Sequence, residues 1–175
     1  GPGFTNLITP MLDMTNDSTP GIFITGQVPL NAIGTNAFQE APSIELSSHV
    51  TKYSTQITNI IDIEIELDKA FKIAYNGKMG AVHIDIPKCV ASSSMKKSDY
   101  ETLTINNIDK TYKFPNIFKK LKNSDACFSR TLEAINNSKK PIIYLGQGCV
   151  GSYELLRKFA ITGNIPVTST IHGCG

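Results

Sequence analysis

The amino-acid sequence predicts an α/β fold in which parallel sheets are flanked by helices. Short apolar runs alternate along the chain with segments of helical apolar spacing, and this alternation is typical of parallel strands joined by crossover helices. Hydrophobic residues make up 41% of the 175 residues, which is enough to form a buried core. The length suits one ordinary domain or two small ones.

Four apolar runs bounded by turn residues predict buried strands. They cover residues 19–26, 80–87, 141–146 and 165–170. In the second run, His83 and Asp85 alternate with the apolar positions. Each run leads into a loop, so polar loop residues follow the ends of the predicted strands.

Three segments predict helices that lie between these strands. The clearest is 60–74, where apolar residues cover a broad face, and the others are 130–137 and 152–162. In the first helix, acidic residues come early and Lys69 and Lys72 come late, an order that suits the helix dipole.

Residues 91–126 differ from the rest of the chain. They are rich in Ser, Asn and Lys, and their apolar residues have no sustained period, which is typical of a linker. Acidic residues interleave with the lysines, so we expect a solvated linker and not a nucleic-acid contact. The predicted organisation is one domain over 1–90, the linker, and the start of a second domain over 127–175. Both ends look cut, and we expect the chain to be part of a longer protein.

The composition excludes several functional classes. The formal net charge is only +2, which calls for neither nucleic acid nor an anionic membrane as a partner. No apolar run approaches the roughly 18 residues that span a bilayer, and no export signal is visible. The four cysteines form no C-x-x-C pair, so a reduced interior compartment is expected. The three histidines do not cluster with cysteines or carboxylates, so no metal site is predicted.

Two glycine-containing loops in the first half are candidate binding segments. Gly1 and Gly3 precede a helical run, where free backbone N–H groups attract anionic groups, although a plain tight turn also explains them. Gly26 and Gln27 follow a strand, at the edge where open α/β sheets bind ligands, although a structural turn is an equal alternative.

Two further loops carry candidate residues. The segment 34–40 places Phe38, Gln39 and a carboxylate side by side, although core packing would also explain the aromatic ring. Gly146-Gln147-Gly148 follows a strand and lets the backbone approach a phosphate or ribose, but a third glycine at the dinucleotide-binding spacing is missing. No self-contained nucleophilic machinery is visible in the sequence.

Taken in order, these segments resemble the catalytic large subunit of acetohydroxyacid synthase, also called acetolactate synthase. The loop 26–29 followed by Gly34-Thr35-x-Ala37-Phe38-Gln39-Glu40 is the most particular part of the resemblance. The other matching segments are Gly1 to Leu7, Asp17 to Pro20, Thr51-Lys52, Ile84 to Lys88, Lys140 to Gly148 and Ile165 to Thr170.

The resemblance implies a fold and a reaction. Residues 1–90 correspond to the latter part of a pyrimidine-binding thiamine-diphosphate domain, and 127–175 to the start of a Rossmann-like, FAD-binding middle domain. The implied cofactors are thiamine diphosphate, Mg²⁺ with its ligands outside this chain, and non-redox FAD. The implied enzyme is a transferase that condenses two pyruvates to 2-acetolactate and CO2, or pyruvate with 2-oxobutyrate, in branched-chain amino-acid biosynthesis.

The resemblance also assigns roles to residues. Phe38, Gln39 and Lys88 correspond to catalytic positions near the substrate channel, as an apolar wall, a hydrogen-bonding amide and a positive charge. The positions that correspond to thiamine-diphosphate binding are Gly1, Gly3, Gly26 and Gln27. The FAD side would be lined by Gly146, Gln147 and Gly148 and hydrogen-bonded by Thr168, Ser169 and Thr170.

Several positions depart from the family pattern: Asn36, Pro42, Lys78, Met79 and Cys89. They favour one alternative, a non-catalytic nucleotide-binding remnant. A second alternative is another FAD-containing thiamine-diphosphate enzyme of the pyruvate oxidase or glyoxylate carboligase type, although the segment Ala37 to Glu40 speaks against it. The resemblance implies a homodimer or higher homo-oligomer that acts on 2-oxo acids, with a regulatory small subunit as a further candidate partner. The expected location is the bacterial cytoplasm or the plastid stroma, and the isolated 175-residue chain is expected to be inactive.

Overall fold

The computed structural model describes residues 1–101 and 125–174. The chain divides into two units, Gly1–Lys119 and Lys120–Gly175, which are described separately. This division falls within the segment 91–126 that we expect to link two domains, and residues 102–124 of that segment lie outside the described residues.

A three-stranded parallel sheet forms the centre of the first unit. Its order is β1 (Gly21–Gln27), β3 (Ala81–Pro87) and β2 (Tyr53–Gln56). Gln27 of β1 pairs with Pro87 of β3, so both strands end at the same edge of the sheet. Loops that follow these strands therefore meet at that edge.

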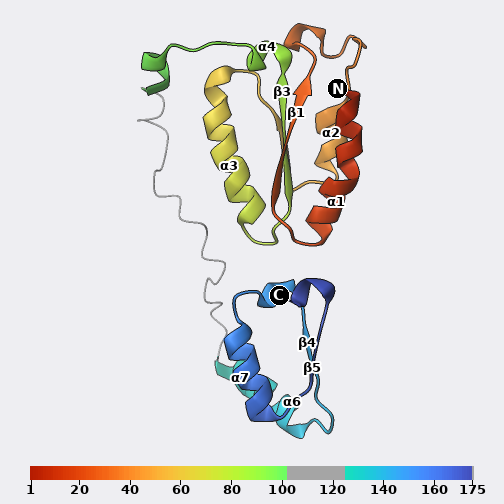
Figure 1. The fold of residues 1–175 in the computed structure, drawn as a ribbon, viewed down its shortest axis with the longest axis vertical. Coiled ribbons are helices and arrows are strands. Elements are labelled where there is room, and N and C mark those ends of the chain that lie inside the picture. The colour runs from red at the N-terminus through yellow and green to blue at the C-terminus, as the bar shows by residue number, and fades with distance from the viewer. Residues whose placement is uncertain (102–124, 175) are drawn as a thin grey trace. The chain divides into compact units, whose positions relative to one another are not determined.

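Helices cover both faces of this sheet (Figure 1). The first face carries η1 (Pro2–Leu7), α1 (Ile8–Asn16) and α2 (Ser43–Ser48). The second face carries α3 (Ile63–Tyr75), which is preceded by η3 (Ile60–Asp62). The connections after β1 and β3 contain η2 (Leu30–Ala32) and α4 (Lys88–Ala91).

The alternation of side chains along β3 divides the core between the two faces. Val82 and Ile84 pack with Ala70 and Ala74 of α3 in one cluster. Ala81 packs with Phe4 and Met11 in the other cluster. His83 and Asp85 have the same parity as Ala81, and both are fully buried. Covering the sheet on two sides thus places two ionisable side chains in the interior.

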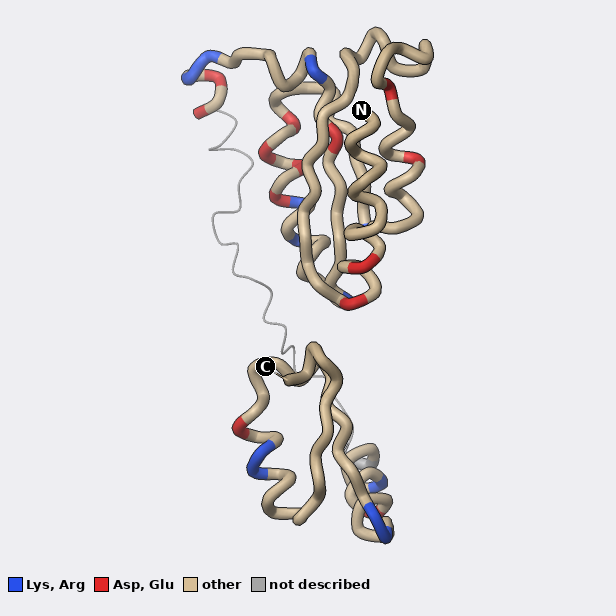
Figure 2. The backbone as a smooth tube through the Cα atoms, turned by 45° about the vertical axis from the view of Figure 1, so that its right-hand side comes forward, with Lys and Arg blue, Asp and Glu red and all other residues tan. Residues whose placement is uncertain are grey.

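Lys52 ties the end of α3 to the sheet. Its Nζ donates to the carbonyl of Ile73, and to the carbonyl of Asn76 at 2.6 Å. The last carbonyls of a helix have no partner within the helix, and a cation there suits the helix dipole. Acidic residues lie along α3 (Figure 2), and Glu64 and Glu66 occupy its first turn.

The second unit contains two parallel strands, β4 (Ile143–Leu145) and β5 (Val167–Ser169). Its helices are α6 (Asp125–Asn137) and α7 (Tyr153–Gly163), and α7 ends at Asn164 in the left-handed conformation. Two short 3-10 turns follow the strands, η4 (Gln147–Cys149) and η5 (Ile171–Gly173). A two-stranded sheet of this kind is marginal by itself.

The predicted α/β fold is confirmed. Each of the four predicted strands is present; β1 starts later and ends one residue later than predicted, and the other three are shortened. Of these four, β3 is buried as predicted, whereas β1 is mostly half-buried and β4 and β5, in a sheet of two strands, are half-buried or exposed. The predicted helices 60–74, 130–137 and 152–162 correspond to η3 with α3, α6 and α7. The strand β2 and the helix α2 have no strong sequence signal, because both are short and mostly polar. None of the described helices is long and apolar enough to cross a membrane.

Candidate functional site

A pocket of about 380 Å³ lies at the carboxyl end of β1. Three separate segments form it: the turn η1, the end of β1 and the loop 33–41. The lining residues are Gly1, Pro2, Gly3, Phe4, Leu7, Thr25, Gly26 and Gln39. The fold thus brings together four residues assigned to the cofactor or substrate by resemblance, namely Gly1, Gly3, Gly26 and Gln39.

Close backbone approach shapes this pocket. The terminal ammonium group of Gly1 donates to the carbonyl of Gly26 at 2.6 Å. A Cβ on Gly1 would lie 2.8 Å from the carbonyl oxygen of Gln39, so a side chain would push the loop away. At Gly3 and Gly26, a Cβ would instead project into open space. The glycines therefore leave room for a ligand against bare backbone.

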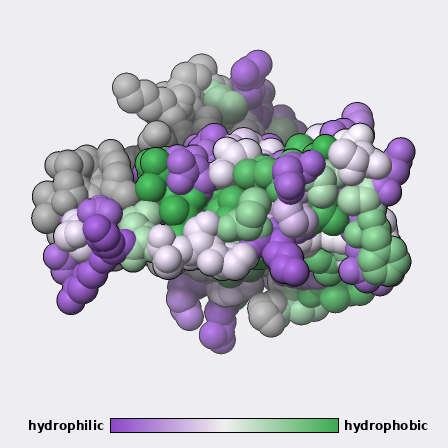
Figure 3. All heavy atoms as spheres, turned by 90° about the horizontal axis from the view of Figure 1, so that it is seen from above, coloured by the Kyte–Doolittle hydropathy of each residue, from purple (hydrophilic) through white to green (hydrophobic). Residues whose placement is uncertain are grey.

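The loop 33–41 is closed by one carboxylate. Glu40 accepts hydrogen bonds from the backbone nitrogens of Gly34, at 2.5 Å, and Ala37, at 3.0 Å. These bonds hold the pKa of Glu40 below its ordinary value, with the Gly34 bond the largest cause. The Phe38 side chain is 90% exposed at the tip of the loop. Figure 3 shows hydrophobic residues exposed among hydrophilic ones on the face that it draws.

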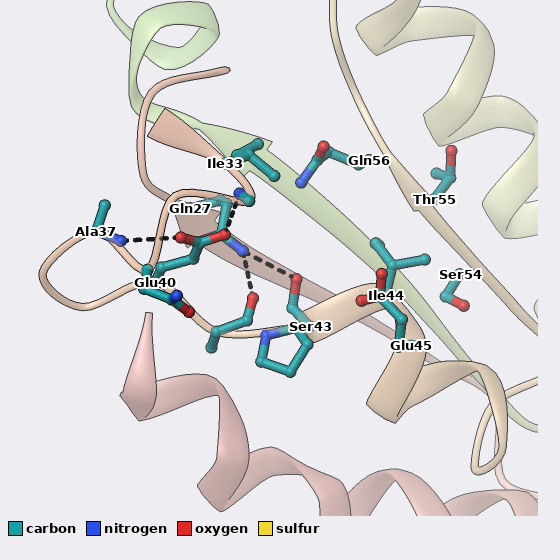
Figure 4. A pocket seen from close by; sticks show the side chains of 14 residues that line it. Gln27, Ile33, Ala37, Glu40, Ser43, Ile44, Glu45, Ser54, Thr55 and Gln56 are labelled. Atoms are coloured by element: carbon teal, nitrogen blue, oxygen red, sulfur yellow. Dashed lines mark hydrogen bonds between the residues drawn. The ribbon is translucent and has the colours of Figure 1, made fainter. Parts of the chain in front are cut away.

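Gln27 anchors the loop to the sheet. Its Nε2 donates to the carbonyl of Ala41 at 2.7 Å, and its Oε1 accepts from the nitrogen of Val28 at 3.0 Å. Its side-chain nitrogen also lies 3.3 Å from Ser43 Oγ and from Asp85 Oδ2. Gln27 is only 7% exposed, so its amide points into the protein, where it positions the loop (Figure 4).

Asp85 is the centre of a buried polar network. Its Oδ1 accepts from Thr25 Oγ1 at 2.7 Å, and its Oδ2 accepts from Ser43 Oγ at 2.5 Å. Gln27 and Gln56 each add a donor to Oδ2 at 3.3 Å. Four neutral donors thus compensate a carboxylate that has no exposure to solvent.

His83 extends the network toward α2 and the pocket wall. Thr25 donates its only hydroxyl proton to Asp85, so the 2.8 Å contact with His83 Nε2 requires the ring to donate to Thr25. Ser47 Oγ lies 2.8 Å from Nδ1, and the Phe4 ring packs on the imidazole with a centroid distance of 4.9 Å. Burial lowers the pKa of His83, and the charge of Asp85 opposes this shift.

A larger pocket of about 860 Å³ lies beside the same loop, and Gln27, Glu40, Ser43 and Gln56 are among its lining residues (Figure 4). Gln39 lines the smaller pocket and Glu40 lines the larger one. Successive residues of the loop therefore face two different cavities.

Lys88 begins α4 directly after β3, at the edge of the sheet that holds the pocket. Its side chain is exposed, and Lys88 lines neither of these two pockets. Phe38 likewise lies outside both linings.

In the second unit, the residues that the resemblance assigns to FAD lie at the ends of β4 and β5. A Cβ at Gly146 or Gly148 would project into open space. The backbone nitrogen of Thr170 donates to the carbonyl of Leu145 at 2.8 Å. The Thr170 hydroxyl accepts from the backbone nitrogen of Gly173 at 3.1 Å. Ser169 Oγ contacts Cys174 Sγ at 3.1 Å, and Thr168 is exposed. The Thr170 hydroxyl keeps its proton for a further acceptor.

No group of three or more His, Cys, Asp or Glu side chains in residues 1–101 and 125–174 is arranged to hold a metal ion. The four free cysteines are separate from one another in the chain.

Two departures from the family pattern have local structural explanations. Asn36 has a φ of +57°, and asparagine adopts this left-handed conformation more readily than most residues. Cys89 lies in α4, and its Sγ accepts from the nitrogen of Leu30 at 3.4 Å. Neither departure disrupts the loop or the sheet edge.

The sequence analysis did not identify Thr25, Ser43, Gln56 and Asp85 as a connected group. The available signal was the alternation of His83 and Asp85 with apolar residues in a run that predicts a buried strand. Charged groups in such positions need polar partners, but the partners come from β1, α2 and β2, and two of these elements were missed.

Comparison with known families agrees with this architecture. Residues 128–175 match the family described as thiamine pyrophosphate enzyme, central domain. Thiamine pyrophosphate is another name for thiamine diphosphate. The second unit is therefore related to the central domain of the thiamine pyrophosphate enzymes.

Whole-chain comparison gives a more particular relationship. The chain is 35% identical to the mitochondrial catalytic subunit of acetolactate synthase from Aspergillus candidus and 37% identical to chloroplastic acetolactate synthase 2 from Nicotiana tabacum. The mitochondrial acetolactate synthase of Schizosaccharomyces pombe is 36% identical. Each comparison covers 100% of this chain but only 25% to 26% of the relative. The resemblance to acetolactate synthase catalytic subunits is thus confirmed, for a chain that spans about a quarter of their length.

Proposed function

We propose that this chain is a segment of an acetolactate synthase catalytic subunit. The complete protein would condense two pyruvates to 2-acetolactate and CO2, or pyruvate with 2-oxobutyrate to 2-aceto-2-hydroxybutyrate, in valine, leucine and isoleucine biosynthesis. The observation that carries the proposal is the convergence of Gly1, Gly3, Gly26 and Gln39 on one pocket. Sequence similarity over the whole chain supports the same reaction.

We propose the pocket at the end of β1 as the binding site of thiamine diphosphate. Open space beside Gly3 and Gly26 leaves room for a flat ring to approach the backbone. When bound, this cofactor supplies the electron sink for the carbanion chemistry. Gln39 would offer its amide to the cofactor or substrate, and the exposed Phe38 would give the channel an apolar wall. Lys88 would place a positive charge near the entrance for anionic 2-oxo acids.

FAD is the second proposed cofactor, in a non-redox role. Open space beside Gly146 and Gly148 and the free proton of the Thr170 hydroxyl would suit its phosphate and ribose groups. Gln147, Thr168 and Ser169 complete the proposed contacts. Mg²⁺ would be held by residues outside this chain.

The proposed assembly is a homodimer or higher homo-oligomer, with a regulatory small subunit as an additional partner. The relatives carry chloroplastic or mitochondrial names, and we propose the plastid stroma or a bacterial cytoplasm for this chain. The alternatives of pyruvate oxidase or glyoxylate carboligase type, or a nucleotide-binding remnant, are not favoured by these relatives.

Product identification tests the proposal. The complete protein that carries this chain is incubated with pyruvate, thiamine diphosphate, Mg²⁺ and FAD, and the products are identified by mass spectrometry. We expect 2-acetolactate. Acetyl phosphate in the presence of phosphate, or tartronate semialdehyde from glyoxylate, would support the alternative enzymes, and no turnover of any 2-oxo acid would contradict the proposal.

A further inference from the structure

The loop 33–41 presents two side chains whose proposed roles depend on their placement. Gln39 faces the pocket at the end of β1, whereas Phe38 is 90% exposed. Asn36 and Gln39 both have left-handed backbone conformations, with φ of +57° and +68°. Asparagine tolerates this conformation, but it is costly for glutamine, so the surrounding structure must enforce it at Gln39.

Glu40 supplies that enforcement through its carboxylate. Oε1 accepts from the nitrogen of Gly34 and Oε2 accepts from the nitrogen of Ala37. The nitrogen of Glu40 itself donates to the carbonyl of Ala37 at 2.9 Å. These three bonds close residues 34–40 into a ring that contains the exposed Phe38, and Figure 4 shows the two carboxylate bonds.

The chemistry of this closure needs a carboxylate. Two backbone N–H groups converge on one side chain, and both oxygens of an ionised carboxyl group accept hydrogen bonds. A glutamine has one accepting oxygen, and its NH₂ group would face a second N–H donor. The lowered pKa of Glu40 has the same origin, since both backbone bonds favour the ionised form.

We propose that Glu40 is a positioning residue for the reaction: its carboxylate fixes the loop conformation that places Phe38 and Gln39 toward cofactor and 2-oxo acid. This inference rests on the proposed function above. It adds Glu40 to the residues on which turnover depends, although Glu40 faces the larger pocket beside the loop. In the proposed function, the neighbouring Phe38 and Gln39 would contact the cofactor or substrate.

Glu40→Gln in the complete protein tests the inference, with Glu45→Gln as the matched control. Glu45 is an exposed carboxylate in the first turn of α2, and it lines the same larger pocket. We expect Glu40→Gln to lower kcat/KM for pyruvate about tenfold, the cost of a displaced catalytic loop. We expect the FAD affinity to stay within about twofold of the wild type, because FAD would bind in the other unit, and Glu45→Gln to retain wild-type kinetics.

A double-mutant cycle separates positioning from a general structural role. In a Phe38→Ala/Gln39→Ala background, the positioned side chains are gone, so adding Glu40→Gln should change kcat/KM by less than about twofold. A full tenfold loss in that background would overturn the inference. Equal kinetics of Glu40→Gln and the wild type would also overturn it.

Hydrogen–deuterium exchange gives a readout that does not depend on turnover. At least one of the two amides, Gly34 or Ala37, should exchange about tenfold faster in Glu40→Gln than in the wild type, because one of them loses its acceptor. Unchanged exchange at both amides would overturn the inference. If the wild type turns over no 2-oxo acid while this exchange difference is present, the proposed function fails and the loop closure by Glu40 stands.

Discussion

The side-chain amide of Gln27 donates to the carbonyl of Ala41 at 2.7 Å, and so joins the carboxyl end of β1 to the end of the loop 33–41. The same nitrogen lies 3.3 Å from a carboxylate oxygen of Asp85 on the neighbouring strand. A chain of hydrogen bonds thus runs from the buried centre of the sheet to the loop that carries Phe38 and Gln39. The position of the loop depends on the interior of the domain.

Replacing Asp85 by Asn should destabilise the first unit by about 3 kcal/mol. The substitution keeps the shape of the side chain but turns an NH₂ group toward donors from Thr25 or Ser43. Hydrogen–deuterium exchange of the β3 amides in the complete protein measures the local opening free energy. Asp13→Asn, an exposed change on α1, serves as the control and should leave this free energy unchanged. Equal protection of β3 in the two variants would contradict the role given to Asp85.

His83 should make the first unit sensitive to acid. Burial holds its folded-state pKa below the ordinary value of 6.5, so the unfolded chain takes up the proton first as the pH falls. Stability is therefore lost as the pH drops below about 6.5. Between pH 7.5 and 5.5, the thermal midpoint of the wild type should fall by at least about 2 °C more than that of His83→Gln.

His49→Gln is the matched control for this pH dependence, since His49 is exposed at the end of α2. Its thermal midpoint should fall with pH as the wild type does. If His83→Gln were as sensitive to acid as the wild type, protonation of His83 would not be the cause.

Lys52→Met should loosen the end of α3. The methionine keeps the apolar stem but removes the ammonium group that donates to the carbonyls of Ile73 and Asn76. Hydrogen bonds from a charged donor contribute about 1.5 to 3 kcal/mol, so the last turn of α3 should exchange its amides at least tenfold faster. Lys78→Met, at an exposed turn position, should leave this exchange unchanged. Faster exchange in both variants would point to loss of charge in general.

The sequence predicted the parts of this fold that have a strong apolar pattern. The strands β1 and β3 and the helix α3 are the clearest examples, because their apolar residues share one core cluster. Val82 and Ile84 of β3 are fully buried there, and Ile22 of β1 and Leu67 of α3 pack against it. The strand β2, with the sequence Tyr-Ser-Thr-Gln, carries no such pattern and is a strand because it pairs with β3. Its position depends on tertiary contacts that a local window cannot show.

Part of the candidate site could likewise be predicted from the sequence, and part could not. Gly1 and Gly3 were identified at a helix start, Gly26 after a strand and Gln39 in the loop 34–40. The fold brings them together. Gln27 was expected to face a cofactor, yet its amide is used within the protein. The orientation of a polar side chain at a strand end depends on its partners, here Ala41 and Asp85, which are distant in sequence.

Cofactor binding by two glycine variants tests the central claim most directly. Leucine at position 3 would fill the space beside the pocket at the end of β1, and leucine at position 148 would fill the space beside β4. In the complete protein, isothermal titration should show thiamine diphosphate affinity reduced more than about tenfold in Gly3→Leu, with FAD affinity retained. Gly148→Leu should show the reverse. Wild-type thiamine diphosphate affinity in Gly3→Leu would contradict the account of this pocket as the cofactor site.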